Sequence, residues 1–251
     1  MMPGSYETSN QIHAWKVDGV KTLMIIPAYN EAENIVRVVE ELRRVRPDAD
    51  FVVVNDGSGD DTRLLCTQHG YPVLDLSTNL GLAGAFQTGM RYAYEEGYDA
   101  ALQLDGDGQH DPAFIAVMES TMEKEEADIV IGSRFVTKKR PHTLRMIGNR
   151  IISWAIRVTS GYHLTDPTSG MRLYGRRIMR YMAYEINASP EPNTITHMLR
   201  SGARMTEVQV DMRERTAGES YLSLGRSAFY MIHIVMDIFF VQRFRKRSHV
   251  V

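Results

Sequence analysis

Residues 100–112 read AALQLDGDGQHDP, and the organisation of the chain can be worked out from this stretch. Ala100–Leu104 is a short apolar run of the kind expected for a strand buried on both faces. The run ends at Asp105, and Asp107 follows two positions later. Side chains two positions apart on an extended strand end point to the same side, so both carboxylates are expected to face one ligand. The glycines after each aspartate permit a tight turn and the close approach of that ligand.

Paired carboxylates suit a hard divalent cation, Mg²⁺ or Mn²⁺, which keeps open positions for phosphate oxygens. We therefore predict Asp105 and Asp107 as metal ligands at the end of a buried strand. A solvated Asp-Gly turn is the alternative interpretation, because such turns are common. His110 is near enough in sequence to ligate a metal, but we expect it to face solvent.

Short apolar runs alternate with segments of helical spacing throughout the first half of the chain. The predicted strands are Thr22–Ile26, Phe51–Val54, Val73–Leu76, Ala100–Leu104 and Ile129–Ile131, and the predicted helices are Glu31–Arg46, Leu82–Glu95 and Pro112–Glu125. Strands separated by helices of this length make βαβ units and a parallel sheet. We therefore predict one α/β domain that binds its ligands beyond the carboxyl ends of the strands. In the second half, Leu144–Val158 has a helical pattern and Met205–Val210 resembles a strand.

Polar residues follow the other predicted strands at the same edge of the sheet. Asn30 and Glu31 follow the first strand, Asp56 follows the second and Asn79 the third. Pro27 is expected to end the first strand, and Asn30 can cap the helix that follows it. Capping alone would explain these residues, so the sequence leaves a structural and a ligand-binding interpretation open.

Two of these segments could line a nucleotide pocket. A base could pack near Tyr29, which belongs to the sequence PAYNE at residues 27–31. Asp56, in the sequence NDGS at residues 55–58, could accept hydrogen bonds from a base or a ribose. The same composition is that of a plain Asx turn, and the two interpretations are equally compatible with the sequence.

Residues 134–165 contain seven Lys or Arg residues and no Asp or Glu. A solvated cationic face is the usual explanation of such a run. Cations without acidic neighbours beside a diphosphate site would instead attract an anionic second substrate. Arg134 is the best placed of them, because it directly follows the predicted strand at Ile129–Ile131.

The composition is that of a globular protein. Of the 251 residues 43% are apolar and 24% charged, and the net charge is −2. These values exclude wholesale disorder, a collagen-like repeat and a disulfide scaffold. The near-neutral balance argues against a nucleic-acid partner, which would favour a basic protein. Cys66 is the single cysteine, which fits a reducing compartment.

The ends of the sequence give no sign of a leader or a spanning helix. Residues 1–15 lack a basic segment followed by an apolar core, so no signal peptide is expected. No apolar run reaches the ~18–20 residues that a spanning helix needs. The longest candidate, Ala228 to Val241, contains His233 and Asp237 and is followed by a basic tail. It could lie in a membrane interface, dock on a membrane helix or pack on its own domain.

Seven motifs together resemble the family 2 glycosyltransferases, and within them the dolichyl- or polyprenyl-phosphate sugar synthases. The motifs are PAYNE (27–31), NDGS (55–58), NLGLAGA (79–85), DGDGQHDP (105–112), GSR (132–134), DPTSGMR (166–172) and RTAGES (215–220). The resemblance implies an α/β protein with the GT-A (Rossmann-like) fold: a mostly parallel sheet flanked by helices, with a C-terminal amphipathic helical appendage. We expect an N-terminal extension at 1–20, the GT-A domain at 21–222, and the appendage with its basic tail at 223–251.

The resemblance implies an inverting, Mg²⁺- or Mn²⁺-dependent transfer of a hexose from a UDP- or GDP-sugar to a polyprenyl phosphate. The metal site would comprise Asp105, Asp107 and Gln109, with Asp107 also counted as catalytic. The nucleotide-sugar site would comprise Pro27, Tyr29, Glu31, Asp56, Asn79, Asp105, Arg215 and Ser220. The acceptor phosphate would be held by Arg134, Arg145, Arg150 and Ser153.

The chain also departs from the pattern of the phosphate-sugar synthases. Asn55 stands in place of a more usual acidic residue, and Tyr221 stands where those enzymes usually have Lys. The segment Ser189–Pro192 is similar to that of soluble bacterial members, which implies a separate small membrane protein as partner of the C-terminal helix. A cytoplasmic protein, peripheral at the inner face of the membrane, is therefore expected, and a homo-oligomer is a further expectation.

Three other functions fit parts of the sequence. A family 2 enzyme that elongates a cell-surface polysaccharide would use a saccharide hydroxyl and would need a general base, for which Asp166 and Glu191 are candidates. A non-catalytic nucleotide-sugar-binding subunit would bind donor without turnover, which the intact DxD pair disfavours. A nucleotidyltransferase would need a glycine-rich start with basic spacing that the sequence lacks.

Overall fold

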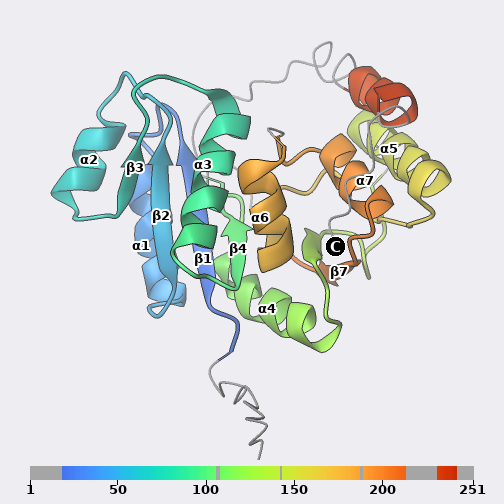
Figure 1. The fold of residues 1–251 in the computed structure, drawn as a ribbon, viewed down its shortest axis with the longest axis horizontal. Coiled ribbons are helices and arrows are strands. Elements are labelled where there is room, and N and C mark those ends of the chain that lie inside the picture. The colour runs from blue at the N-terminus through green and yellow to red at the C-terminus, as the bar shows by residue number, and fades with distance from the viewer. Residues whose placement is uncertain (1–18, 106–107, 142, 187–188, 213–230, 242–251) are drawn as a thin grey trace, which may run out of the picture.

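The computed structural model describes residues 19–105, 108–141, 143–186, 189–212 and 231–241 of the chain. Within these residues the strands form one seven-stranded sheet (Figure 1). Its order is β3 (Val73–Asp75), β2 (Asp50–Asn55), β1 (Thr22–Ala28), β4 (Ala100–Gln103), β6 (Arg172–Gly175), β5 (Ile129–Ser133) and β7 (Met205–Gln209). β6 is antiparallel to both neighbours and the other pairs are parallel. The predicted α/β class with a mostly parallel sheet is confirmed.

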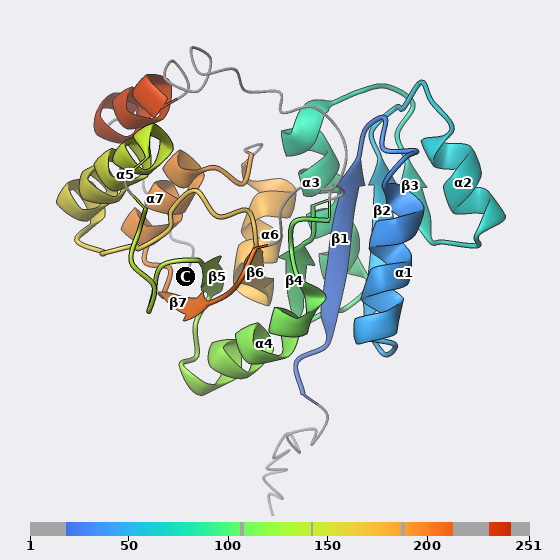
Figure 2. The ribbon, with the colours of Figure 1, turned by 180° about the vertical axis from the view of Figure 1, so that it is seen from behind.

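Helices cover both faces of the sheet, as the two opposite views show (Figures 1 and 2). One face carries α1 (Ile35–Val45), α2 (Thr62–Gln68) and α4 (Ile115–Lys124), the last entered through a short 3₁₀ turn at Pro112–Phe114. The other face carries α3 (Gly81–Glu95), α5 (Leu144–Ser160), α6 (Arg176–Tyr184) and α7 (Pro192–Arg200). A last helical segment, residues 231–236 with a π-helical turn at Asp237–Val241, packs beside α5 and α7.

The alternation of side chains along β1 produces the two cores. Leu23 and Ile25 belong to the core under α3, whereas Met24 and Ile26 belong to the core under α1. Successive residues of a strand point to opposite faces, so a strand covered on both sides must be apolar at every position. This is why the predicted strands appear in the sequence as continuous apolar runs.

The second half of the sheet differs from the sequence prediction. β6 and its antiparallel pairing with β4 and β5 carry no strong local signal, and α2, α6 and α7 were also not predicted from the sequence. The first strand continues to Ala28, so Pro27 does not end it. The first helix begins at Ile35 rather than near Glu31. Leu144–Val158 and Met205–Val210 are confirmed as α5 and β7.

The C-terminal segment is part of the same packed unit in the described residues. Ile234 and Ile238 are buried in the core that α3, α5, α6 and α7 share. The proposed boundary near residue 222 lies outside the described residues and stays a prediction. None of the helices in the described ranges is long and apolar enough to cross a membrane.

Gly89 tests the packing of α3 on the sheet. A Cβ added there would lie 2.4 Å from Cγ2 of the fully buried Ile25, a β-branched side chain with little freedom to move. Gly89→Ala should therefore lower the free energy of unfolding by about 1–3 kcal/mol through overpacking. Gly59→Ala is the control, because nothing lies within 4 Å of its added Cβ. Equal effects of the two substitutions in denaturant titrations would contradict this packing.

Candidate active site

The polar residues singled out in the sequence follow the carboxyl ends of β1, β2, β4 and β5. These parallel strands end at the same edge of the sheet, so the loops after them share one side of the molecule. The structure brings together two groups of side chains there. The first follows β1, β2 and β4, and the second follows β5 and precedes β6.

The loops after β1 and β2 are tied to each other by hydrogen bonds. The backbone N–H of Asn30 donates to Oγ of Ser58 at 3.0 Å, and Oδ1 of Asn30 accepts from the N–H of Gly59 at 2.9 Å. Asn30 has a φ of 54°, a left-handed conformation that Asn tolerates better than most residues. The structure thus corrects the helix-capping interpretation of Asn30, because its side chain faces the neighbouring loop.

The same two loops are joined a second time one residue further on. The N–H of Glu31 donates to Oγ1 of Thr62 at 2.9 Å, and the N–H of Ala32 donates to Oδ2 of Asp60 at 3.1 Å. Burial raises the pKa of Asp60, but the hydrogen bonds from Thr62 and Ala32 outweigh it and leave the pKa below its usual value. Asp60 is therefore ionised at neutral pH and holds the loops in register.

Asp56 is buried between β2 and the start of α3. Its Oδ1 accepts from the backbone N–H of Leu80 at 2.7 Å. Gly57, with a φ of 65°, permits this approach, since an added Cβ would lie 2.7 Å from the backbone N of Asn79. Oδ1 of Asn79 in turn accepts from the N–H of Gly81, which opens α3. Three motifs distant in the sequence therefore form one surface.

Three more of the residues predicted for the nucleotide site lie beside these loops. Tyr29 is 45% exposed directly after β1, and Pro27 lies within the strand beside it. The carboxylate of Glu31 accepts a hydrogen bond from Nδ2 of Asn34 at 2.9 Å. Arg215 and Ser220 lie outside the described residues, so their placement stays a prediction.

Asp105 is held at the end of β4 by its neighbours in sequence. Nε2 of Gln103 donates to Oδ1 of Asp105 at 2.9 Å, and the backbone N–H of Asp105 donates to Nδ1 of His110 at 3.1 Å. In neutral His110 this places the proton on Nε2, which lies 3.4 Å from Oδ2 of Asp105. His110 is only 4% exposed, so the expectation that it faces solvent is wrong.

These contacts leave Asp105 suited to a hard cation. The carboxylate of Asp105 has a fixed orientation, and the Asp105 side chain is 35% accessible. Carboxylate oxygens are the ligand type that Mg²⁺ and Mn²⁺ prefer. Gln109 is half-buried nearby in sequence, and Asp107 lies outside the described residues. Among the described residues no cluster of three His, Cys, Asp or Glu side chains forms a complete metal site. Asp107 therefore remains the predicted second carboxylate.

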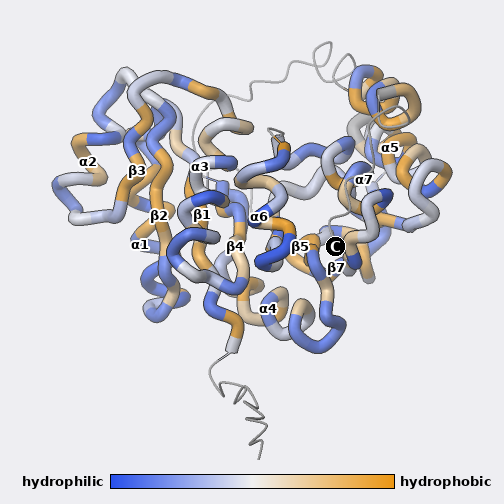
Figure 3. The backbone as a smooth tube through the Cα atoms, in the orientation of Figure 1, coloured by the Kyte–Doolittle hydropathy of each residue, from blue (hydrophilic) through white to orange (hydrophobic). Residues whose placement is uncertain are grey.

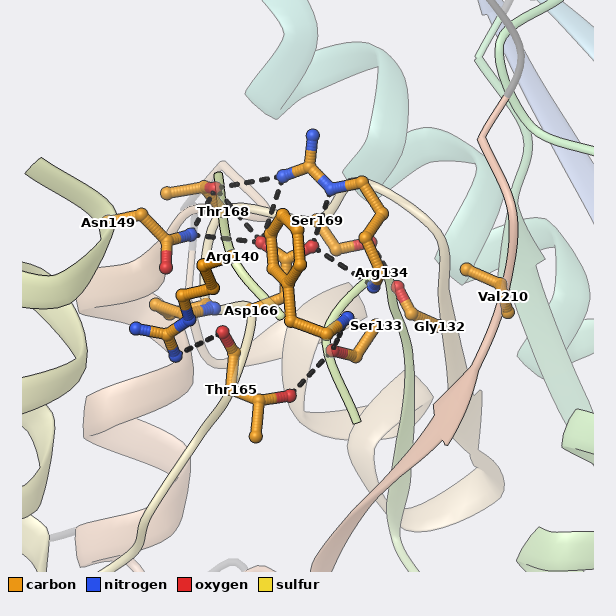
Figure 4. Close-up of polar contacts among 12 residues, drawn as sticks. Gly132, Ser133, Arg134, Arg140, Asn149, Thr165, Asp166, Thr168, Ser169 and Val210 are labelled. Carbon is orange, nitrogen blue, oxygen red and sulfur yellow. Dashed lines mark hydrogen bonds and ion pairs between the residues drawn. The ribbon is translucent and has the colours of Figure 1, made fainter. Parts of the chain in front are cut away.

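A second polar cluster lies beyond the end of β5, around Asp166 (Figure 4). Arg134 donates from Nε to Oδ2 of Asp166 at 2.6 Å and from Nη2 to Oδ1 at 2.9 Å. The Asp166 side chain is fully buried, whereas that of Arg134 is 22% accessible. The remaining guanidinium nitrogen points away from Asp166 (Figure 4). This two-pronged ion pair fixes the plane of the guanidinium and leaves one edge of it turned away from Asp166.

Two more side chains, those of Asn149 and Glu207, bind the Asp166 segment. Nδ2 of Asn149, on α5, donates to Oδ1 of Asp166 at 3.0 Å and to Oγ1 of Thr168 at 2.9 Å. The backbone N–H groups of Thr165 and Asp166 donate to the carboxylate of Glu207 on β7 at 2.7 and 2.9 Å. Because its oxygens accept from Arg134 and Asn149, Asp166 fits the predicted role of general base poorly and fits a role in orienting Arg134 well.

Asn149 is the site residue that sequence reasoning missed. It lies one helical turn before the predicted Ser153 on the same face of α5. Ser153 is buried and accepts from Nη2 of Arg140 at 3.3 Å, so it contacts a different cation. Burial lowers the pKa of the Arg140 guanidinium, which also donates to the carbonyl of Thr165. Arg150 is exposed, and nothing is described of the side chain of Arg145.

The segment 166–170 connects the two clusters. Its first residue, Asp166, binds Arg134, and its last, Gly170, lies against Asp105, since an added Cβ there would be 3.0 Å from Oδ2 of Asp105. The buried Arg172 on β6 donates from Nη2 to the carbonyl of Pro167 at 2.9 Å and from Nη1 to the carbonyl of Pro190. The two halves of the site are therefore parts of one structure.

The buried ion pair should be needed for stability. Asp166→Asn leaves Arg134 without its counter-charge, which should lower the free energy of unfolding by roughly 3–5 kcal/mol. Asp211→Asn is the control, because its pair with Lys138 is mostly exposed and should contribute less than about 1 kcal/mol. Denaturant midpoints that fall equally for both variants would contradict the assignment of Asp166 as the organising group.

Comparison with known proteins agrees with this architecture. A profile of glycosyl transferase family 2 matches residues 24–185. The chain is 34% identical over 220 residues to the undecaprenyl-phosphate mannosyltransferase of Micrococcus luteus, covering 82% of this chain and 89% of that one. It is 27% identical over 216 residues to the polyprenol monophosphomannose synthase of Mycolicibacterium smegmatis, covering 81% of each.

The fold has a counterpart among solved structures. Glucosyl-3-phosphoglycerate synthase from Mycobacterium tuberculosis, in complex with Mn²⁺, uridine diphosphate and glucosyl-3-phosphoglycerate, superposes with a TM-score of 0.65. The match covers 88% of this chain and 80% of that one at 18% identity, and therefore concerns the fold. With the family profile spanning more than half of the sequence, the chain belongs to glycosyl transferase family 2 and is a glycosyltransferase with the GT-A fold.

Proposed function

We propose that this enzyme transfers a hexose, with inversion, from a nucleotide sugar to the phosphate of a polyprenyl phosphate. The observation that carries the proposal is the Arg134–Asp166 pair beyond the end of β5, joined through residues 166–170 to Asp105 beyond β4. One side of the site presents a guanidinium edge and the other a carboxylate. Two anionic substrates, one reached through a cation and one through a metal, would meet between them.

The relatives support a lipid phosphate as acceptor. The proteins from M. luteus and M. smegmatis are named for transfer to undecaprenyl phosphate and for synthesis of a polyprenol monophosphate sugar, and both matches cover about four fifths of this chain. Their names supply the acceptor class, and the cluster around Arg134 supplies a place for its phosphate. Arg145, Arg150 and Ser153 remain predicted helpers.

A phosphate acceptor is compatible with the burial and hydrogen bonding of Asp166. A phosphate is ionised at neutral pH, so its oxygen can attack the anomeric carbon without a general base. A saccharide hydroxyl would need a base within about 3 Å. Asp166 is fully buried and hydrogen-bonded to Arg134 and Asn149, which leaves it poorly placed for that task. The task of the described residues is then to position the acceptor, which can supply roughly 7–11 kcal/mol in favourable cases.

The donor would bind across the first cluster. Tyr29, Glu31 and Asp56 would contact the nucleoside, and Asn79 would lie near the sugar–phosphate. Asp105, with Asp107 and Gln109, would hold a divalent cation, and a bound cation would stabilise the negative charge that builds on the leaving diphosphate. The Mn²⁺ and uridine diphosphate in the mycobacterial synthase support this assignment. Arg215 and Ser220 are proposed to close over the same diphosphate.

The site of action follows from the acceptor. A polyprenyl chain is confined to a bilayer, so the enzyme is proposed to work as a peripheral protein at the cytoplasmic face of the membrane, where nucleotide sugars are available. A separate small membrane-protein partner and a homo-oligomer stay predictions.

Removal of metal should stop the reaction. With labelled UDP- or GDP-sugar and a short-chain polyprenyl phosphate, EDTA should lower transfer by roughly a hundredfold or more, and added Mn²⁺ should restore it. Asp105→Asn should raise the Mn²⁺ concentration that restores half of the activity, whereas Asp48→Asn, an exposed carboxylate beside Arg46, should not. Full activity in EDTA would refute the metal assignment. Thermal-shift measurements with the same UDP- and GDP-sugars identify the preferred nucleotide, because the donor that binds the folded enzyme raises its melting temperature.

Arg134→Lys tests the acceptor site. The substitution keeps a positive charge beside Asp166 but removes the guanidinium edge that points away from Asp166. The KM for polyprenyl phosphate should rise roughly tenfold, with the donor KM unchanged. Lys139→Gln, which removes an exposed cation from the same basic stretch, should change neither. Product formed only with a saccharide acceptor, and a pH profile showing one essential base, would favour polysaccharide elongation instead.

A further inference from the structure

One face of α5 is apolar and exposed. Ile147, Ile151, Trp154 and Val158 are spaced by four, three and four residues, so they form a single stripe along the helix. Trp154, the largest of them, is 58% exposed. An exposed tryptophan within a continuous apolar stripe is uncommon on a soluble surface and marks an interaction site.

The opposite face of α5 already has its partners. Met146, Ile152 and Ile156 are buried, and Asn149 binds Asp166 from the same face. The exposed stripe is therefore not needed to hold α5 on the domain. α5 separates the acceptor cluster from the stripe by about the thickness of one helix, on the order of 10 Å.

The last helical segment extends this surface. Ile234 and Ile238 face the core, whereas other apolar residues of the segment are exposed. The Trp154 and Phe239 rings lie 5.7 Å apart, so the two helices are in contact, and both views show them side by side (Figures 1 and 2). Apolar residues run along both helices (Figure 3). We call the following set the apolar platform: Ile147, Ile151, Trp154, Val158, Ile232, Met236 and Phe240.

The exposed charged residues of α5 beside the apolar platform are all positive. Arg150 and Arg157 are exposed on this helix, which contains no acidic residue. In the terminal segment the side chain of Asp237 accepts a hydrogen bond from Asn193. Exposed cations at the edge of an apolar surface complement anionic lipid headgroups above an acyl layer. A second copy of this face would instead bring the same cations together.

We propose that the apolar platform docks on an anionic bilayer surface and holds the acceptor cluster one helix thickness, on the order of 10 Å, from that surface. Trp154 and its neighbours enter the headgroup region, while Arg150 and Arg157 meet lipid phosphates. A polyprenyl phosphate then keeps its chain in the bilayer and reaches Arg134 past the end of α5. The choice of lipid as the occupant rests on the proposed function, but the docking is measured independently of catalysis.

Fluorescence of Trp154 tests the contact directly. The chain has two tryptophans, so full-length Trp15→Phe leaves Trp154 as the only reporter. Vesicles of phosphatidylcholine and phosphatidylglycerol in equal parts should shift its emission to the blue, and brominated acyl chains should quench it. Vesicles of phosphatidylcholine alone should give a weaker response. Emission that neither anionic vesicles nor brominated lipid alters would overturn the proposal.

Matched variants separate the platform from general hydrophobicity. Ile151→Ser/Trp154→Ser should lower the fraction that sediments with the anionic vesicles, with an affinity at least about tenfold weaker. Val117→Ser/Leu64→Ser is the control on other helices: Leu64 is 52% exposed against 58% for Trp154, and Val117 45% against 46% for Ile151. The double variant Ile147→Ser/Val158→Ser provides a second test if the first double variant has a lower melting temperature than the wild type. Vesicle binding unchanged in both test pairs would overturn the proposal.

The same vesicle measurements test the two exposed arginines and the two other possible binding partners of the apolar platform. Arg150→Gln and Arg157→Gln should each weaken binding to anionic vesicles roughly fivefold, without effect on neutral ones. A wild-type dimer that Ile151→Ser/Trp154→Ser converts to monomer, with no vesicle binding by either, would assign the platform to a second copy. Binding only to vesicles that carry a membrane protein would assign it to that partner. Either result overturns lipid docking.

Activity separates this proposal from the proposed function. With a short-chain acceptor in detergent, Ile151→Ser/Trp154→Ser should retain wild-type transfer, and with long-chain acceptor in vesicles it should lose most of it. No transfer by the wild type to either acceptor would refute the proposed function and leave the vesicle measurements valid. Equal loss with both acceptors would mean that the platform serves catalysis rather than docking.

Discussion

The ion pair between Arg134 and Asp166 is the interaction on which both halves of the site depend. Asp166 is fully buried and accepts hydrogen bonds from the guanidinium of Arg134 and the amide of Asn149, so protein groups compensate its charge. A buried carboxylate with one partner removed is strongly destabilising, and the segment it begins would lose its position. That segment ends at Gly170, against Asp105 and His110. The groups that hold Asp166 therefore also hold the segment that lies between Arg134 and Asp105.

The antiparallel strand β6 explains why this segment lies in the site. The neighbouring parallel strands β4 and β5 end at the ligand-binding edge of the sheet, and β6 runs the other way between them. A strand of opposite direction must begin at that edge, so the residues just before Arg172 lie between the loops after β4 and β5. Arg172 then fixes the segment through the carbonyl of Pro167. One reversed strand thus places a connecting loop between the two polar clusters, where we propose that donor and acceptor meet.

The first half of the molecule could be predicted from the sequence, because continuous apolar runs and helical spacing are local signals. Asp56 and Asp105 were placed correctly at one sheet edge, since parallel strands fix which ends coincide. The partners of these residues could not be predicted in the same way. Asp166 lies 32 positions from Arg134, and Asn149 reaches it from α5 only because α5 packs there. His110 is likewise buried in the folded chain, where Gly170, distant in the sequence, lies against its ring. The roles given to Asp107, Arg215 and Ser220 stay predictions.

In the proposed function, the Asp105 side and the Arg134 side of the site hold their two ligands next to each other. Paramagnetic relaxation of the acceptor phosphorus measures this directly, with Mn²⁺, a nucleoside diphosphate and a short-chain polyprenyl phosphate bound to the wild-type enzyme. We expect Mn²⁺ to shorten the phosphorus relaxation time of the bound acceptor strongly, and Asp105→Asn to weaken this effect. An acceptor that binds with unchanged affinity, but whose phosphorus relaxation is the same with Mn²⁺ as with Mg²⁺, would contradict it.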